Sequence, residues 1–191
     1  MISGILLAAG LSTRYSAGNK LLAGIDGVAL VRRTAKAYVD AGLDELVVVT
    51  GHEREKLEEA LHELPLRFVH NPRFAEGQSG SLHAGIQGLA PSTEAAIIGV
   101  ADQPYLSNLV LQDMVKTYRS AHCPLVVPRY DGQRGNPVLF DSALFSELQL
   151  VQGDIGGRPV LKAHSDEICW VDFPTALWAF DVDTVQDLHS L

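Results

Sequence analysis

Short, continuous apolar runs alternate with helical patterns along this chain, and this alternation restricts the fold more than any other feature. The runs over 2–7, 45–50 and 95–100 are typical of strands buried on both faces. Between the first two, apolar residues at helical spacing over 27–41 predict a helix that stops at Gly42. Hairpin signals are lacking between the runs. We therefore expect a mostly parallel central sheet with helices on both faces, a Rossmann-like three-layer α/β sandwich.

The rest of the chain continues the alternation. Further strands are expected over 66–69, 125–127, 137–140, 168–171 and 176–180. Further helices are expected over 52–64, 81–89, 109–121, 141–148, 158–164 and 184–191. The 191 residues are enough for one sizeable α/β domain and short for two, which predicts a single domain over 1–191.

Charge and composition exclude several classes of protein. The formal net charge of −8 argues against a general nucleic-acid or membrane-binding surface, so any polyanion must be bound by a local group of cations. No apolar run approaches the length of a membrane span and no basic segment precedes the first strand, so we expect a soluble, cytoplasmic protein. Cys123 and Cys169 show no metal-ligand spacing, and we expect them to be reduced, buried thiols.

The loop after the first run combines small residues with two cations. Ala8, Ala9 and Gly10 end the run, and Arg14 and Lys20 follow. Small side chains let backbone N–H groups approach a ligand, and fixed cations favour a polyanion. Ligands of such sheets bind at the carboxyl ends of the strands, where this loop is expected. The chain contains neither GxxxxGK[ST] nor a GxGxxG after a strand, which argues against a P-loop ATPase and a Rossmann dinucleotide site.

Acidic residues lie at two further positions: after the apolar run over 95–100 and at the start of the last predicted helix. Asp102 follows the run over 95–100, and an acidic residue at the tip of a buried strand can hold Mg²⁺. Taken alone, Asp102 is more typical of a turn or cap residue. Near the end of the chain, Asp183 or Thr184 is a candidate cap of the last predicted helix.

Six segments together resemble one known family. Residues 7–22, LAAGLSTRYSAGNKLL, resemble the nucleotidyltransferase signature LAAGxSxRxGxxK. The other matches are 71–85 to NPxWxEGMxxSLxxG, 97–104 to a strand ending in GDQP, 132–140 to GxRGHPVLF, 152–158 to GDxGAR, and 180–188 to D-[IV]-D-T-P-E-D-L. The combination resembles the MobA-like NTP transferase family, in particular its molybdopterin cytidylyltransferases. The chain departs from the pattern in two places: Arg14 and Lys20 are six residues apart rather than five, and Asn136 replaces a histidine.

This resemblance implies a reaction and a set of roles. The reaction is transfer of CMP from CTP to the phosphate of molybdopterin or the molybdenum cofactor, with Mg²⁺ as cofactor and release of pyrophosphate. The implied catalytic residues are Arg14, Lys20 and Asp102, and the implied metal ligands are Asp102 with Asp181 or Asp183, which the sequence does not separate. The implied nucleotide-binding residues are Leu7, Ala8, Ala9, Gly10, Arg14, Lys20, Gly80 and Ser81, and the implied acceptor-binding residues are Arg134, Gly135, Asn136 and Asp154.

Other functions stay open at this point. The family's cytidylyl branch has LAAG where its guanylyl branch has LAGG, which favours CTP over GTP, and the methyl group of Ala9 would tighten the base pocket. One alternative is a nucleotidyltransferase for a sugar phosphate or polyol phosphate. Another is a non-catalytic nucleotide-binding or cofactor-delivery protein that docks to a molybdoenzyme. A molybdoenzyme or its chaperone is the candidate protein partner, and neither nucleic acid nor a membrane is expected.

Overall fold

The computed structural model describes residues 1–189, which form a three-layer α/β structure around an eight-stranded sheet. The strand order is β10-β7-β9-β6-β1-β4-β5, with β8 paired to β7. The strands are β1 (Ile2–Ala8), β4 (Glu45–Thr50), β5 (Arg67–His70), β6 (Ala95–Val100), β7 (Leu125–Tyr130), β8 (Gln133–Arg134), β9 (Val138–Asp141) and β10 (Ile168–Phe173). The α-helices are α1 (Leu30–Asp40), α2 (Arg54–Ala60), α3 (Gln78–Gln87), α4 (Asn108–Ala121), α5 (Phe145–Leu148), α6 (Arg158–Ala163) and α7 (Val185–His189).

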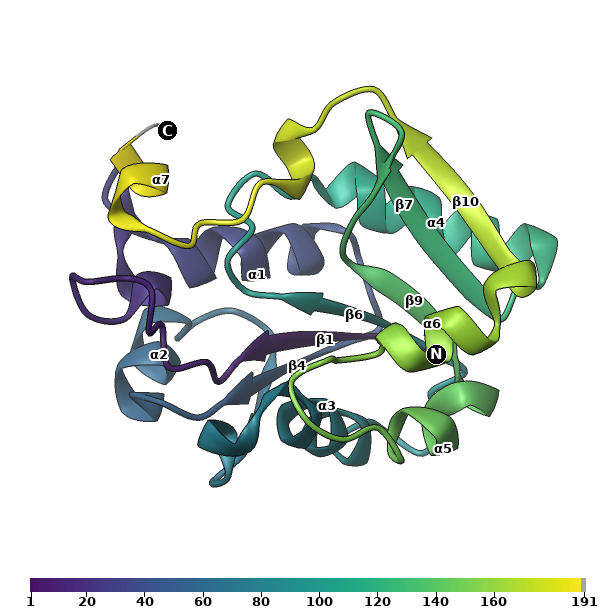
Figure 1. Cartoon of the computed structure of the whole chain (residues 1–191), viewed down its shortest axis with the longest axis horizontal. Helices are drawn as coiled ribbons and strands as arrows, with labels where there is room; N and C mark the ends of the chain where they lie inside the picture. The colour runs from purple at the N-terminus through teal and green to yellow at the C-terminus, as the bar shows by residue number, and fades with distance from the viewer. Residues whose placement is uncertain (190–191) are drawn as a thin grey trace.

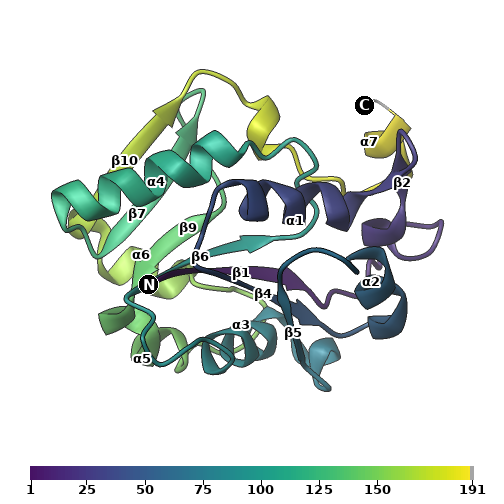
Figure 2. The same ribbon diagram turned by 180° about the vertical axis from the view of Figure 1, so that it is seen from behind.

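Strand β1 lies near the middle of the sheet and determines where the two cores form. It pairs in parallel with β4 on one side and β6 on the other. Ile5 and Leu6 are both fully buried, but successive strand residues point to opposite faces, so they belong to different hydrophobic clusters. The cluster with Leu6 includes residues of α1 and α4, and the cluster with Ile5 includes residues of α3 and α5. Figures 1 and 2 show these two helix pairs on opposite faces of the sheet.

The predicted α/β class and mostly parallel sheet are confirmed, with one reversed strand inside the sheet. Strand β9 pairs antiparallel with both β6 and β7, whereas β10 and β7 are again parallel to each other. The apolar run predicted over 137–140 is therefore a strand, but its pattern carried no sign of its direction. The reversal places the segment after β8 beside the carboxyl end of β6.

Three expectations about local structure were wrong: that hairpins are lacking, that the first helix begins at residue 27, and that residues 176–180 form a strand. A small hairpin, β2 (Gly24–Ile25) with β3 (Val28–Ala29), precedes α1, which begins at Leu30 rather than at residue 27. Its turn residues, Asp26 and Gly27, have φ angles of 50° and 77°, as in the Asp-Gly turns that favour two-residue hairpins. The segment 176–180 is not a strand but contains a short 3₁₀ helix, η5 (Leu177–Ala179). The last predicted helix is α7, and residues 190–191 of that prediction lie outside the described residues.

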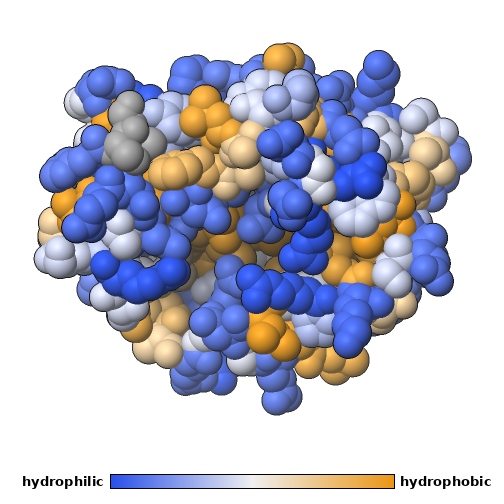
Figure 3. Space-filling view, turned by 45° about the horizontal axis from the view of Figure 1, so that its top comes forward, coloured by the Kyte–Doolittle hydropathy of each residue, from blue (hydrophilic) through white to orange (hydrophobic). Residues whose placement is uncertain are grey.

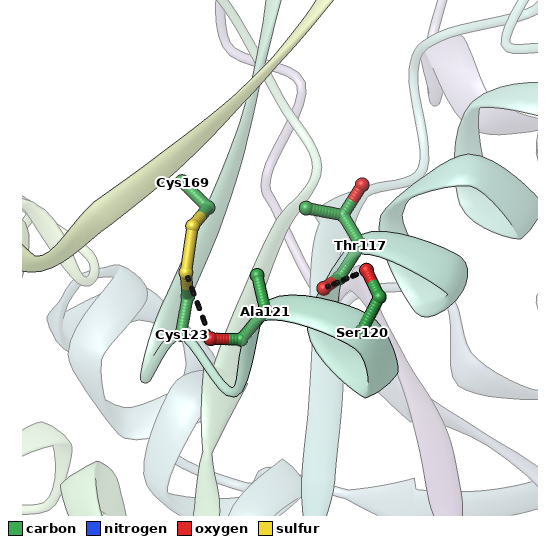
Figure 4. Close-up of a disulfide and its surroundings, with 5 residues drawn as sticks. All are labelled: Thr117, Ser120, Ala121, Cys123 and Cys169. Atoms are coloured by element: carbon green, nitrogen blue, oxygen red, sulfur yellow. Dashed lines mark hydrogen bonds between the residues drawn. A yellow bond between two sulfur atoms is a disulfide. The ribbon is translucent and has the colours of Figure 1, made fainter.

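The two cysteines form a disulfide, so the expectation of reduced thiols was also wrong. Cys123 follows α4 in the turn before β7, and Cys169 lies in β10 (Figure 4). Parallel pairing sets Cys169 opposite Val126 of β7, which brings the two cysteine Cα atoms to 6.0 Å. Across residues 1–189, no helix is both long and apolar enough to cross a bilayer.

Candidate active site

The loop after β1 is folded so that Lys20 begins a helical turn beside the sheet. Ser12 adopts a left-handed conformation with φ of 55°, and its Oγ accepts a hydrogen bond from the backbone N–H of Lys20 at 3.2 Å. Asn19 caps the 3₁₀ helix η1 (Lys20–Leu22) because its Oδ1 accepts from the N–H of Leu21 at 3.1 Å. These two contacts set the origin of the Lys20 side chain, although the loop is longer than the family pattern.

Two cations of this loop meet two carboxylates that lie far away in the sequence. The Lys20 Nζ lies 2.6 Å from Asp102 Oδ2 and 3.0 Å from Asp183 Oδ1. Arg14 Nη1 lies 2.7 Å from the other carboxylate oxygen of Asp183. Burial disfavours the charged ammonium, but the two carboxylates outweigh this effect and raise the pKa of Lys20. We call Arg14, Lys20, Asp102 and Asp183 the ionic cluster.

Backbone contacts hold Asp102 at the carboxyl end of β6. The N–H of Ala101 donates to the carbonyl of Leu7 at 3.1 Å, which ties the loop to β1. The N–H of Val182 donates to the carbonyl of Asp102 at 3.0 Å, so the C-terminal segment runs alongside the loop. The side chain of Val182 is fully buried, which anchors the segment between the two neighbouring aspartates.

The neighbouring aspartates, Asp181 and Asp183, have different surroundings. Asp183 belongs to the ionic cluster and does not cap α7. Instead, Thr184 and Asp187 form a reciprocal cap, in which Asp187 Oδ2 accepts from the N–H of Thr184 at 2.7 Å and Thr184 Oγ1 accepts from the N–H of Asp187 at 3.2 Å. Partial burial of its carboxyl and the negative charge of Asp102 raise the pKa of Asp181 to about 6, against a hydrogen bond from Gln103 and the charge of Lys20.

The ionic cluster lies where two cavities adjoin. The larger cavity has a volume of about 500 Å³ and is lined by the loop after β1 and the start of α3, and the smaller has about 370 Å³. Both cavities are lined by Arg14, Asp102 and Asp183, so a group bound in one would meet a group bound in the other at these side chains. The space-filling view shows a hollow face with hydrophilic side chains around hydrophobic ones (Figure 3).

The structure brings most of the sequence-predicted residues to these cavities. The larger cavity is lined by Leu7, Ala9, Gly10, Arg14, Lys20, Ser81, Asp102, Asp154 and Asp183. The smaller cavity is lined by Leu7, Arg14, Asp102, Arg134, Asn136, Asp181 and Asp183. Their roles in binding or catalysis stay predictions.

Three predicted residues, Ala8, Gly80 and Gly135, line neither cavity. The side chain of Ala8 is fully buried in the hydrophobic core. Gly80 packs against Asn71, because a Cβ built on it would lie 3.3 Å from Asn71 Nδ2. Gly135 packs against the ring of Tyr130, which a Cβ on the glycine would approach to 2.5 Å. Asp154 lines the larger cavity beside the loop after β1, and its expected role in acceptor binding stays a prediction.

Helix α3 begins earlier than predicted, and the expected roles of Gly80 and Ser81 in nucleotide binding stay predictions. The helix begins at Gln78, so Gly80 and Ser81 are not its first residues. The first two N–H groups of the helix already have partners within the protein. Gln78 N–H donates to Asp154 Oδ1 and Ser79 N–H donates to Gly153 O, both at 3.1 Å. Residues 153–154 therefore accept the first two N–H groups of the helix.

Sequence reasoning missed several side chains that line the cavities, and two of them stand at the start of a helix. Gln78 lines both cavities at the start of α3, and Arg158 lines the smaller cavity at the start of α6. Arg158 is the last residue of the matched segment 152–158, so that segment offered a signal for it. Gln78 carried none, because a glutamine in a polar loop is unremarkable without the fold.

Comparison with known proteins agrees with the fold and identifies the family. Residues 4–168 match the model of the MobA-like NTP transferase domain. Nicotine blue oxidoreductase of Paenarthrobacter nicotinovorans is 28% identical over 197 residues, covering 100% of this chain and 96% of that protein. A nucleotidyl transferase from Methanothermobacter thermautotrophicus has a similar structure, with a TM-score of 0.85, 24% identity and coverage of 100% of this chain and 95% of that one. The Mycobacterium tuberculosis protein Rv0371c, solved in complex with manganese, has a TM-score of 0.76, 23% identity and coverage of 99% and 96%.

Proposed function

The chain belongs to the MobA-like NTP transferase family, and from this premise we propose that it transfers CMP from CTP to the phosphate of molybdopterin or the molybdenum cofactor. The observation that carries the proposal is the ionic cluster at the junction of the two cavities. One cavity would take the nucleotide and the other the acceptor, so that the reacting phosphates meet at Arg14, Asp102 and Asp183.

The proposed reaction needs little proton chemistry. A phosphate oxygen of the acceptor attacks the α-phosphorus of CTP, a new P–O bond forms, and the bond to the pyrophosphate leaving group breaks. The attacking oxygen is already an anion, so no general base is required. Catalysis then consists of positioning the two substrates and neutralising the charge of the phosphates, which the cations Arg14 and Lys20 can do.

The carboxylates of the site fit a divalent cation that binds together with substrate. Asp102 Oδ1 is buried and has no hydrogen-bond partner within residues 1–189, which leaves one hard oxygen for such an ion. In the same part of the chain, no group of three His, Cys, Asp or Glu residues is arranged to hold a metal by itself. Mg²⁺ is commonly held by one or two carboxylates, with water and substrate phosphates completing its shell. Asp102 with Asp181 or Asp183 would hold it, and the ion would neutralise charge on the phosphates.

Base choice is assigned to Ala9. Its side chain is buried, lines the larger cavity and packs against Gly51, where a built Cβ would lie 2.8 Å from the Ala9 methyl. Replacing Ala9 with glycine would widen the pocket and relax the preference for the smaller pyrimidine. An assay in which CTP and GTP compete measures the base preference. An unchanged preference for CTP in Ala9→Gly would show that Ala9 does not determine base choice.

Acceptor choice is assigned to the smaller cavity. Arg134, Asn136 and Arg158 line it, and guanidinium groups recognise phosphate oxygens with paired donors. A sugar phosphate or polyol phosphate would also satisfy these donors, which keeps a nucleotidyltransferase for another acceptor as the second candidate function.

The experiment is a matrix of pyrophosphate-release assays. Each nucleoside triphosphate is combined with molybdopterin or with a panel of sugar and polyol phosphates, with Mg²⁺ or with EDTA. We expect release only with CTP, molybdopterin and the metal. Release with a sugar or polyol phosphate would establish the second candidate. No release with any acceptor would refute the transferase proposal.

A matched pair of variants tests the site itself. Asp102→Asn should abolish turnover while the protein still unfolds cooperatively. Asp172→Asn is the control, because Asp172 is an exposed residue of β10 that pairs with Arg129 at 2.7 Å and lines neither cavity. Turnover by Asp102→Asn at the level of Asp172→Asn would contradict the assignment.

A further inference from the structure

A buried hydroxyl contacts the loop that carries Asp102. Thr34 lies on α1 and is fully buried. Its Oγ1 lies 3.0 Å from the carbonyl oxygen of Ala101 and 3.1 Å from that of Gln103. These are the residues on either side of Asp102, so one hydroxyl from the helix layer contacts both flanks of the carboxylate-bearing residue.

The usual explanation of a threonine inside a helix accounts for Thr34 less well. Such hydroxyls often donate to the carbonyl four residues earlier in the same helix. Here that acceptor is Leu30 O, at 3.4 Å, farther than either loop carbonyl. The hydroxyl has a single proton, and the shorter distances direct it to the loop at Ala101 and Gln103.

Two backbone hydrogen bonds also hold the loop from other parts of the fold. Ala101 N–H bonds to Leu7 of β1, and Val182 N–H bonds to the carbonyl of Asp102. Thr34 adds a side-chain contact from α1 to the carbonyl oxygens of Ala101 and Gln103. The carboxylate that results has Oδ2 at 2.6 Å from Lys20 Nζ and the other oxygen without a hydrogen-bond partner within residues 1–189.

We propose that Thr34 is a positioning residue: its hydroxyl fixes the loop 101–103 so that the Asp102 carboxylate is aimed for cation binding and phosphoryl chemistry. This inference rests on the proposed function. Without the hydroxyl, the carbonyl of Ala101 loses its donor, whereas the carbonyl of Gln103 keeps the N–H of Leu106 at 3.2 Å. The loop can then tilt about one flank, and the carboxylate moves with it.

The test compares three substitutions. Thr34→Val keeps the shape and removes the hydroxyl, and Thr34→Ser keeps the hydroxyl and removes the methyl. Thr50→Val is the matched control, because Thr50 is equally buried, lies at the end of β4 and has an Oγ1 without a hydrogen-bond partner within residues 1–189. It removes a buried hydroxyl without breaking a contact.

The main measurement is binding of Mn²⁺ in the presence of CTP, followed by the electron paramagnetic resonance signal of the free ion. Thr34→Val should weaken Mn²⁺ binding about tenfold, at the lower end of what loss of a supporting hydrogen bond does at a metal site. Its affinity for CTP in EDTA should change less than twofold. In turnover, kcat should fall about tenfold with KM for CTP almost unchanged, and Thr34→Ser and Thr50→Val should both behave like the native protein.

The outcomes are distinguishable from those of the proposed function. Mn²⁺ binding by Thr34→Val equal to that of the native protein would overturn the positioning role and leave the proposed function intact. Equal losses in Thr34→Val and Thr34→Ser would also overturn it, because packing would then explain both. Failure of the native protein to bind Mn²⁺ with CTP would overturn both proposals. If Thr34→Val does not fold, Thr34→Ala replaces it, and only Thr34→Ser should keep Mn²⁺ binding.

Discussion

Replacing Lys20 by methionine should destabilise the metal-free protein by a defined amount. Methionine keeps a long flexible chain but removes the ammonium that contacts Asp102 and Asp183. The two carboxylates then lie close together, with Asp181 adding a third negative charge nearby. The folded state therefore loses an attraction and keeps a repulsion. Because both interactions are largely absent from the unfolded chain, the substitution destabilises the folded state.

The size of the effect follows from the exposure of the ionic cluster. The Lys20 and Asp102 side chains are 15% and 17% exposed, and Asp183 is 33% exposed. Exposed ion pairs contribute up to about 1 kcal/mol, and leaving a fully buried charge unpaired costs about 3–5 kcal/mol. This partly buried cluster lies between those limits, so we expect a loss of about 2 kcal/mol in the free energy of unfolding. For 191 residues this lowers the midpoint of thermal unfolding by about 5 °C.

The assay is thermal unfolding in EDTA near pH 7.5, repeated with Mn²⁺. The pKa of Lys20 is raised in the folded state, so its contribution is fully present below the ordinary value of 10.5 and would fade only as pH rises past the folded-state pKa. Lys36→Met is the control, because Lys36 forms an exposed i,i+4 pair with Asp40 within α1; such a pair contributes about 0.3–0.5 kcal/mol, which corresponds to about 1 °C in the midpoint.

Mn²⁺ should recover at least half of the loss in Lys20→Met, because the cation neutralises the same carboxylates. Two results would refute the reasoning. One is a Lys20→Met midpoint in EDTA no lower than that of Lys36→Met. The other is a large loss that Mn²⁺ leaves unchanged.

Three further substitutions have signed outcomes. Because the pKa of Asp181 is raised to about 6, stability falls as pH rises through that value; Asp181→Asn should therefore raise the unfolding midpoint in EDTA at pH 7.5 and by less at pH 5. Gly99→Ala should cost about 1–3 kcal/mol in urea unfolding, since its Cβ would lie 2.2 Å from the buried Tyr38 hydroxyl. Gly77→Ala should cost about 1–3 kcal/mol and weaken CTP binding, because φ is +116° and the Cβ would lie 3.0 Å from the Gly153 backbone; unchanged CTP affinity would contradict this.

The sheet was largely predictable because its strands are buried on both faces. Ile5 and Leu6 are both apolar and enter different cores, which leaves β1 few places except the middle of a covered sheet. The direction of β9 was not predictable, because an apolar run reads the same in either direction. The Asp26–Gly27 hairpin did carry a local signal, the preference of Asp-Gly for two-residue turns, which the helical pattern after it concealed.

The site was predictable where it depends on the ends of strands and not where it depends on packing between layers. Lys20 and Asp102 come together because β1 and β6 are neighbouring parallel strands whose carboxyl ends meet. The separation of Asp181 from Asp183 needed the buried Val182 between them, which no spacing rule reveals. Thr34 looked like an ordinary helix residue, and only the packing of α1 on the loop 101–103 gives its hydroxyl a partner outside the helix.

The placement of Asp181 and Asp183 on the C-terminal segment has a consequence for the order in which the site is built. Arg14 and Asp183 are 169 residues apart, so on the ribosome one side of their contact is made long before the other. Strands β1, β4 and β6 can pair, and Lys20 can contact Asp102, before Asp181 and Asp183 have been synthesised. Closing so long a loop comes late, because its entropy cost is offset only once the sheet is in place. We therefore expect the site to be completed late in folding, when the N–H of Val182 bonds to the carbonyl of Asp102.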